Sequence, residues 1–406
     1  MKLYLTALLL LCAIPRVLAA EVQSVSRLAF GPDGILFVAD WKASSIHALA
    51  LPAASGPAGG HFNVRDLDRR LAGALGEPPA AIVDLAMRPG TGDAYVAVVV
   101  GAAQTPAVVR LGSNGRAERL DLAATKATSL SLKDAPKGDL KFWEETPLRS
   151  LTVTDMAWRE GKLYVAGLAN TDFSSALRVV SYPFGGDQSV TTVAIYHTMH
   201  DQIETRAPIR AMTLVTLGGE PHLLAAYTCT PLVTIPLAAI KDGAKLTGKT
   251  IAELGFGNAP NGMLAYTAEV NGSPMEFVLV ANGMRSSDAV PMAEIEAANA
   301  RAGLSRMVPF GETAGVRSTP LPLAGVFRID NQDAGRFVAL RRNAETGASE
   351  LVSIAKGLYL RRSDFVAEYN FPGYSYKANG QVQTDYLLPM HQRLNREEGF
   401  PPPVDR

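Results

Sequence analysis

One unit of sequence recurs along this chain of 406 residues and limits the folds that are open to it. Each copy has an apolar strand, a turn that contains glycine, a second strand that often reads x-aromatic-Val-Ala, a polar loop and a third strand. In the first copy these parts are residues 28–30, the turn 31–34, residues 35–40, the loop 41–45 and residues 46–49. Short apolar runs separated by such turns predict β-strands joined as hairpins.

Six copies of this unit can be counted. Their second strands are predicted near residues 35–40, 94–97, 163–166, 222–227, 276–281 and 337–340. Further strand-like runs stand between copies, as at residues 190–196 and 249–254, which gives four strands per unit. Four-stranded units at a spacing of roughly 40–60 residues are typical of propeller blades. We therefore predict an all-β fold, a six-bladed β-propeller. A seven-bladed ring that uses the tail and a pair of β-sandwiches are the alternatives.

The segments outside the repeats have different compositions. Residues 1–20 have Lys2, an apolar stretch at 3–14 and small residues at Ala19 and Ala20, which is the pattern of a signal peptide. We expect a periplasmic or secreted protein with no transmembrane segment after processing. The propeller is predicted over residues 21–370, with a polar insertion at 122–149 and a short helix within 291–304. A tail follows at 371–406.

Charge and cysteine content exclude some classes of function. The 39 basic residues equal the 39 acidic ones, so the chain has no overall positive charge with which to bind nucleic acid. Cys229 is the only cysteine outside the predicted signal peptide, so the mature chain cannot form an intramolecular disulfide. We expect a monomer.

The first copy resembles an NHL repeat and, more loosely, a blade of the SMP-30/gluconolactonase family. The resemblance is carried by Phe30-Gly31-Pro32-Asp33-Gly34, Phe37-Val38-Ala39-Asp40 and Ser45-Ile46. It implies a propeller fold. It says little about function, because propellers support many unrelated activities.

Blade geometry predicts where a binding site lies. Loops between blades and loops between second and third strands emerge on the same face, and those of blades four and five contain the richest polar chemistry. We predict that this face binds a small-molecule ligand or an envelope protein. The candidate ligand-binding residues are Arg206, Arg285, Asn282 and Trp41. Trp41 is also suited to wedging blades together.

The segment 197–206 is the densest polar cluster in the chain, and it supports two metal hypotheses. In the first, Glu204, Asn258 and Asn282 bind Ca²⁺ or a similar divalent ion through oxygen. This set looks like the ligand set of the SMP-30 lactonases, which implies a metal-dependent hydrolase with His200 or Asp201 as the catalytic base. The alternative is that Asp201 and Glu204 pair with Arg206 or Arg210 and only order the loop.

The second metal hypothesis uses soft donors. His197, Met199, His200 and Cys229 offer the nitrogen and sulfur ligands that copper selects. If the strand continued through this segment, His200 would face away from His197 and Met199, which argues against the set. For Cys229 we favour the account of a small buried apolar residue, because cysteine is among the most buried residue types.

We therefore predict an exported propeller with a ligand- or partner-binding face. A divalent-metal-dependent hydrolase of the lactonase type is one alternative. A copper-handling protein, or a scaffold in an envelope complex with residues 122–149 as its docking arm, is the other.

Overall fold

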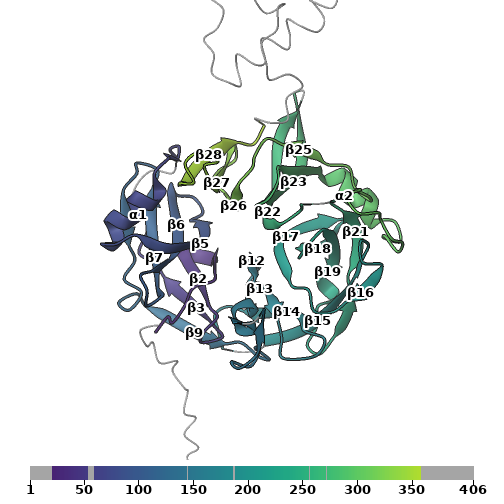
Figure 1. Ribbon diagram of the computed structural model, residues 1–406, viewed down its shortest axis with the longest axis horizontal. Helices are drawn as coiled ribbons and strands as arrows, with labels where there is room; N and C mark the ends of the chain where they lie inside the picture. The colour runs from purple at the N-terminus through teal and green to yellow at the C-terminus, as the bar shows by residue number, and fades with distance from the viewer. Residues whose placement is uncertain are drawn as a thin grey trace, which may run out of the picture.

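The computed structural model confirms the predicted six-bladed β-propeller (Figure 1). It describes residues 21–53, 59–143, 145–185, 188–255, 257–270 and 272–357. The predicted signal peptide at 1–20 and the predicted tail at 371–406 lie outside the described residues. We number the blades by the order of their innermost strands in the chain.

Each blade is a four-stranded antiparallel sheet, and the third blade carries two additional strands. The first blade has β1 (Arg27–Phe30), β2 (Ile35–Asp40), β3 (Ser45–Ala50) and β9 (Ala127–Ser131). The second has β5 (Pro79–Met87), β6 (Asp93–Val100), β7 (Thr105–Gly112) and β8 (Ala117–Arg119). The third has β12 (Asp155–Arg159), β13 (Lys162–Leu168), β14 (Ser175–Ser181), β15 (Gln188–His197), β16 (Gln202–Glu204) and β20 (Lys245–Thr247).

The remaining three blades follow the same plan. The fourth has β17 (Ile209–Leu217), β18 (Glu220–Tyr227), β19 (Pro231–Pro236) and β21 (Lys249–Glu253). The fifth has β22 (Pro260–Val270), β23 (Ser273–Asn282), β24 (Ser287–Pro291) and β25 (Thr319–Leu321). The sixth has β26 (Val326–Asn331), β27 (Arg336–Arg342), β28 (Ser349–Ala355) and β4 (Asn63–Val64). The small hairpin of β10 (Lys141–Phe142) and β11 (Thr146–Pro147) lies outside the blades.

The helices are short. α1 (Leu67–Leu75) precedes the second blade, and α2 (Met292–Asn299) follows β24 in the region where the sequence predicted a helix. Turns of 3-10 helix occur at Pro32–Gly34, Leu148–Leu151 and Leu237–Ala239. Among the described residues, no helix is long and apolar enough to cross a membrane.

Hydrophobic packing between neighbouring blades sets their order around the ring. A separate buried cluster fills each junction: Phe37 of the first blade packs with Leu163 of the third, and Val338 of the sixth packs with Val96 of the second. The order around the ring is therefore second, first, third, fourth, fifth, sixth, and back to the second. Packing between blades also explains the repeated x-aromatic-Val-Ala strand. A second strand is covered on both faces by neighbouring blades, so Phe37, Val38 and Ala39 are all fully buried.

Two strands close the ring from distant parts of the chain. After β3, the chain passes to the sixth blade, where β4 pairs with β28 and Val64 lies opposite Leu351. The second blade follows, and β9 then returns to pair with β3, with Ser129 opposite His47. Residues 127–131 therefore form a blade strand, whereas the sequence predicted an insertion across 122–149. The polar sequence of β9 concealed it, because this outermost strand is covered by only one neighbour.

The chain that follows β9 is anchored by a buried arginine. Arg178, on β14, is fully buried and donates hydrogen bonds to the carbonyl oxygens of Lys133 (2.9 Å), Asp134 (3.2 Å), Leu168 (2.9 Å) and Thr152 (3.3 Å). Burial lowers the pKa of Arg178 to about 10, so the guanidinium stays charged at neutral pH. One side chain thus ties the closing segment to the third blade.

We expect the Arg178→Met variant to lose about 3–5 kcal/mol of unfolding free energy, because it leaves four carbonyl groups, two of them buried, without their donor. Arg178→Lys should lose less, since an ammonium group can satisfy some of these carbonyls. Urea denaturation of the purified protein measures both. Arg206→Met is the matched control, because Arg206 is exposed and donates one hydrogen bond to the residues that the structure describes. A loss below about 1 kcal/mol for Arg178→Met would contradict the anchoring role.

Candidate functional site

The densest predicted site forms where β15 ends. β15 and β16 make a tight hairpin in which Ile195 lies opposite Glu204. Because alternate residues of a strand share a face, His197 and Glu204 project to the same side. The turn at 198–201 then carries His200 back over His197, and their ring centroids are 4.0 Å apart. His200 would face away only if the strand continued past His197, and β15 ends at that residue.

Glu204 bridges the two histidines. Its Oε2 lies 3.0 Å from Nδ1 of His197, and its Oε1 lies 2.5 Å from Nδ1 of His200. The hydrogen bond from His197, assisted by that from His200, lowers the pKa of Glu204 to about 2, so its carboxylate is ionised throughout the physiological range. His197 is buried, whereas the side chain of His200 is 47% exposed. We call His197, His200 and Glu204 the two-histidine cluster. Each offers one possible ligand atom, and these three atoms lie within 4.8 Å of one another.

The fourth blade supplies the surroundings of this cluster. Nε2 of His197 lies 3.4 Å from the Thr230 hydroxyl. The preceding residue, Cys229, has a left-handed backbone with φ 74°, which is uncommon for a residue other than glycine. Burial raises the pKa of the Cys229 thiol, and the nearby carboxylates of Glu253 and Glu204 raise it further. Both effects disfavour the thiolate form of Cys229.

Glu253 is a site residue that the sequence analysis missed. It ends β21, is 2% exposed, and accepts hydrogen bonds from the Thr198 hydroxyl (2.5 Å) and the Gly255 amide (3.1 Å). A single acidic residue within the apolar run 251–256 was the signal that could have identified it.

The two asparagines of the calcium hypothesis differ: within the described residues the buried oxygen of Asn258 has no hydrogen-bond partner, whereas both ends of the Asn282 amide are hydrogen-bonded. The side-chain nitrogen of Asn258 donates to the carbonyl of Cys229 (3.0 Å), so Asn258 borders the cluster. Asn282 is fully buried; its oxygen accepts from the Ala259 amide (2.8 Å) and its nitrogen donates to the Ser286 carbonyl (3.3 Å). Asn282 therefore orders loops of the fifth blade.

The other predicted residues have hydrogen-bond partners in loops of the third, fourth and fifth blades. Arg206 donates to the carbonyl of Asp172 (3.2 Å), and Arg285 pairs with Asp288 (2.6 Å). Asp201 accepts from the Tyr196 hydroxyl (2.5 Å), so His200 and Asp201 have separate partners. Glu204 pairs with the two histidines in place of Arg206 or Arg210. Met199 lies half-buried in the turn between them.

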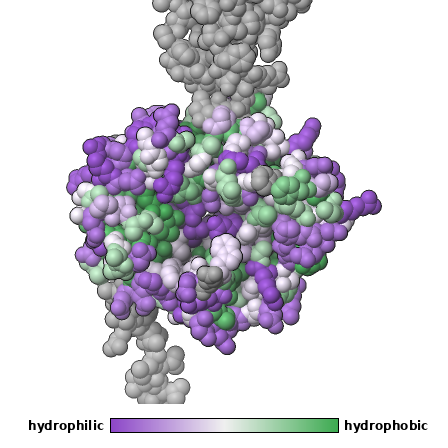
Figure 2. Space-filling model, in the orientation of Figure 1, coloured by the Kyte–Doolittle hydropathy of each residue, from purple (hydrophilic) through white to green (hydrophobic). Residues whose placement is uncertain are grey.

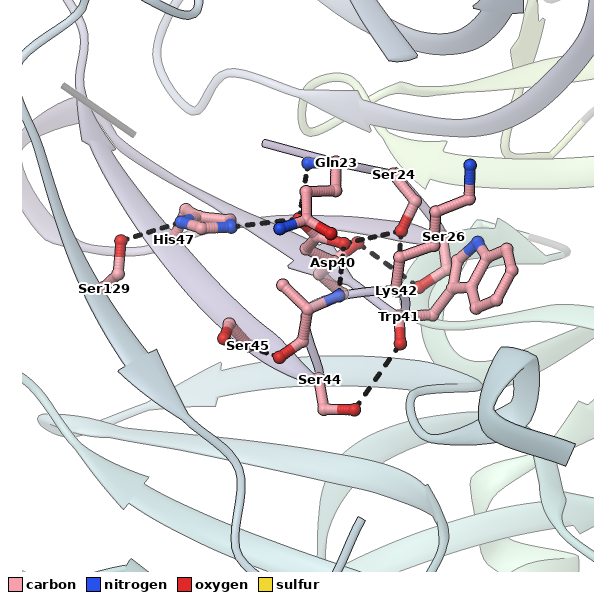
Figure 3. Close-up of polar contacts among 12 residues, drawn as sticks. Gln23, Ser24, Ser26, Asp40, Trp41, Lys42, Ser44, Ser45, His47 and Ser129 are labelled. Carbon is pink, nitrogen blue, oxygen red and sulfur yellow. Dashed lines mark hydrogen bonds and ion pairs between the residues drawn. The ribbon is translucent and has the colours of Figure 1, made fainter. Parts of the chain in front are cut away.

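Trp41 belongs to a different network, in the first blade (Figure 3). The carboxylate of Asp40 accepts hydrogen bonds from the amides of Gln23 (2.6 Å) and Ala43 (3.1 Å) and from the Ser24 hydroxyl (2.6 Å). His47 links Asp40 (3.4 Å) to Ser129 on β9 (2.7 Å).

This serine, histidine and aspartate sequence resembles a catalytic relay, but its contacts are those of a structural tie. Burial alone would raise the pKa of Asp40, and the four hydrogen bonds from its neighbours lower it instead. The network joins the N-terminal segment, the loop of Trp41 and the closing strand β9.

The centre of the propeller carries a second group of polar residues, which the sequence analysis also missed. One position on each innermost strand projects toward the channel, and hydrophilic residues gather at the centre of the ring in Figure 2. We call this set the charged ring; in ring order it consists of Arg328, Asp84, Arg27, Asp155, Arg210 and Asn261. The sign of the charge alternates from Arg328 to Arg210, and the neutral Asn261 of the fifth blade separates these two arginines.

The acidic members of this region also join the blades. Asp84 accepts from Arg328 (2.6 Å) and from the amide of Leu28 in the first blade (2.6 Å). Asp155 accepts from the amide of Met212 in the fourth blade (2.7 Å). Asp330, two residues beyond Arg328 on β26, accepts from the amide of Met87 in the second blade (2.7 Å). Each aspartate thus holds the innermost strand of the next blade.

Burial perturbs the titration of this region. It raises the pKa of Asp155 to about 6 and that of Asp330 to about 6. Burial, followed by repulsion from Arg328, lowers the pKa of Arg27 to about 9.

Comparison with known proteins leaves the family open. No protein-family model and no curated protein matches the chain. Among solved structures it is similar to a chain of a mitotic checkpoint complex (9% identity, TM-score 0.35, covering 87% of this chain and 98% of that one). It is also similar to Drosophila semaphorin 1b (10%, 0.36, 84% and 87%) and to the PQQ-bound aldose sugar dehydrogenase of Streptomyces coelicolor (11%, 0.32, 84% and 96%). At these scores the likenesses carry no argument about function.

The raised pKa values of Asp155 and Asp330 predict a pH dependence of stability. Both folded-state values lie above the ordinary value near 3.8, so the ionised carboxylates cost stability above pH 6. That cost disappears as the pH falls from about 6 to about 4. We expect the Asp155→Asn/Asp330→Asn double variant to gain about 1–2 kcal/mol of unfolding free energy at pH 7.5 and to match the parent at pH 4.5. Urea denaturation at the two pH values measures this, and an equal change at both would contradict it.

Proposed function

We propose that this chain is an exported β-propeller that binds a divalent transition-metal ion through His197, His200 and Glu204. The observation that carries the proposal is the approach of their three ligand atoms to within 4.8 Å of one another. Two imidazoles and one carboxylate suit zinc, iron(II) or copper(II), whereas calcium prefers oxygen ligands. The site lies where the hairpin of the third blade meets the loop of the fourth.

The chemistry of the cluster supports metal binding. The ionised Glu204 accepts hydrogen bonds from the Nδ1 atoms of the two imidazoles, and a cation can displace those protons when it binds. The ion would bind where the Nδ1 atoms meet the carboxylate, and Thr230 on the other ring nitrogen would help to orient His197. The exposed edge of His200 leaves a route from solvent to the site.

A copper-handling role is the second candidate, and Cys229 favours it. Cys229 directly precedes Thr230, whose hydroxyl lies 3.4 Å from Nε2 of His197, and its backbone position is strained for a side-chain-bearing residue. A soft thiolate in addition to two imidazoles would shift metal preference toward copper. Hydrolysis has less support, because Asp201, one of the two predicted bases, is hydrogen-bonded to Tyr196, and Glu204 holds the Nδ1 atom of the other, His200.

Metal titration of the mature protein, stripped with chelator, tests the proposal. We expect one equivalent of Zn²⁺ or Cu²⁺ to bind, with affinity at least about 100-fold weaker in His197→Ala and in Glu204→Ala, since each removes one of three ligands. His200→Ala should weaken binding by about 10–100-fold, because His200 is more exposed. His61→Ala is the matched control, an exposed histidine in another part of the ring.

Cobalt spectroscopy separates the two candidates. If Cys229 ligates, the Co²⁺ form has a sulfur-to-metal absorption band that is lost in Cys229→Ser; a band-free spectrum supports the site of three ligands. Failure of the parent to bind stoichiometric metal, or binding that His197→Ala leaves intact, would overturn the proposal.

A further inference from the structure

A cavity of about 530 Å³ occupies the centre of the propeller, and it lies on the face opposite the two-histidine cluster. It is lined by the hairpin turn of the second blade at Gly90 and by that of the sixth blade at Asp333. These turns join first and second strands. The two-histidine cluster lies beside Thr230, which joins a second strand to a third and is therefore at the other end of the strands.

The charge around the cavity is mixed, with an excess of carboxylates. Arg27 and Arg328 of the charged ring line it, together with four aspartates, which are Asp84, Asp155, Asp330 and Asp333. The remaining arginine of the ring, Arg210, is not among the lining residues. Two guanidinium groups against four carboxylates give a surface that disfavours an anionic ligand.

Several of these polar groups keep hydrogen-bonding capacity. The carboxylate of Asp330 accepts from the amides of Met87 and Asn331 (both 2.7 Å), which leaves lone pairs on both oxygens. The guanidinium of Arg328 donates through Nε and Nη1, and within the described residues its Nη2 has no hydrogen-bond partner. Acceptors and donors therefore stand close together in one cavity.

Aromatic side chains complete the lining. Phe30 and Trp158 both face the cavity and are half-buried. Trp158 is held in place by Phe37 and Tyr182, with ring centroids 5.5 Å and 6.3 Å away. A fixed aromatic face can pack against the C–H face of a sugar ring, and hydroxyl groups both donate and accept.

We propose that the central cavity binds a neutral sugar of one or two rings. Its volume is in the range of small-molecule sites, and its few convergent polar groups, one of them the perturbed carboxylate of Asp330, mark it as a site rather than a packing gap. Asp330 accepts sugar hydroxyls, Arg328 donates to a sugar oxygen, and Trp158 packs against the ring. This site is separate from the metal site of the proposed function.

The test is binding of maltose, D-glucose and D-gluconate to the mature protein, followed by calorimetry and by tryptophan fluorescence. The chain has three tryptophans, and Trp158 is the one that lines the cavity. We expect a neutral sugar to bind and to change the emission, and Trp158→Phe to abolish that change while calorimetry still detects binding. Asp330→Asn, which preserves an acceptor for Met87, should weaken sugar binding at least tenfold.

Asp172→Asn is the matched control, because Asp172 is exposed and lies outside the cavity. It should bind sugar like the parent. Metal binding by Asp330→Asn should be unchanged, so that failure of the sugar site and failure of the metal site are distinguishable. The proposal is overturned if neither neutral sugar binds at 10 mM (about the upper limit for a specific small-ligand site), if gluconate binds better than both, or if Asp330→Asn binds as tightly as the parent.

Discussion

The rest of this structure depends on closure of the ring by β4 and β9, two strands that come from distant parts of the chain. Six blades bury their faces only when every blade has a neighbour on both sides, and the ring has no end at which packing can stop. Here β4 completes the sixth blade and β9 completes the first, although the chain reaches both strands before it has built the third blade. Arg178 and the network of Asp40, His47 and Ser129 hold the segment that makes this return.

The charged ring shows how the closed structure tolerates charge at its axis. A single buried guanidinium or carboxylate costs several kcal/mol if it is left without a partner. Each arginine of the ring has an aspartate of the ring on a neighbouring blade, as Arg328 has Asp84, and the neutral Asn261 separates Arg210 from Arg328. The aspartates also accept backbone amides from the adjacent blade, so the same groups that make the centre polar fix the spacing of the innermost strands. The central cavity is therefore lined by polar side chains whose orientations are fixed by these hydrogen bonds.

The parts that were predictable from sequence are those governed by local pattern. The three inner strands of each blade are buried, so their sequences are either continuously apolar or alternate between apolar and polar residues. Residues 35–40 and 163–166 can therefore be recognised as strands from the sequence. The ring order was not predictable, because it depends on β4 and β9, which are short and polar. The charged ring was hidden for a related reason: its members stand one per blade, dozens of residues apart, and each looks like an isolated polar residue within a strand. The pairing of His197 with Glu204 could have been predicted from the sequence. The position of His200 could not, because it depends on where β15 ends.

The environment of Cys229 bears on what a metal would do in the proposed site. Burial opposes ionisation of the Cys229 thiol, and the negative charges of Glu253 and Glu204 add to that effect. A divalent cation bound to Glu204 would reverse the sign of the local field, and a thiolate beside it would then be favoured. The reactivity of the only cysteine of the described chain would thus depend on metal occupancy. The buried histidine, the bridging carboxylate and the strained cysteine backbone are then understood as parts of one arrangement rather than three separate features.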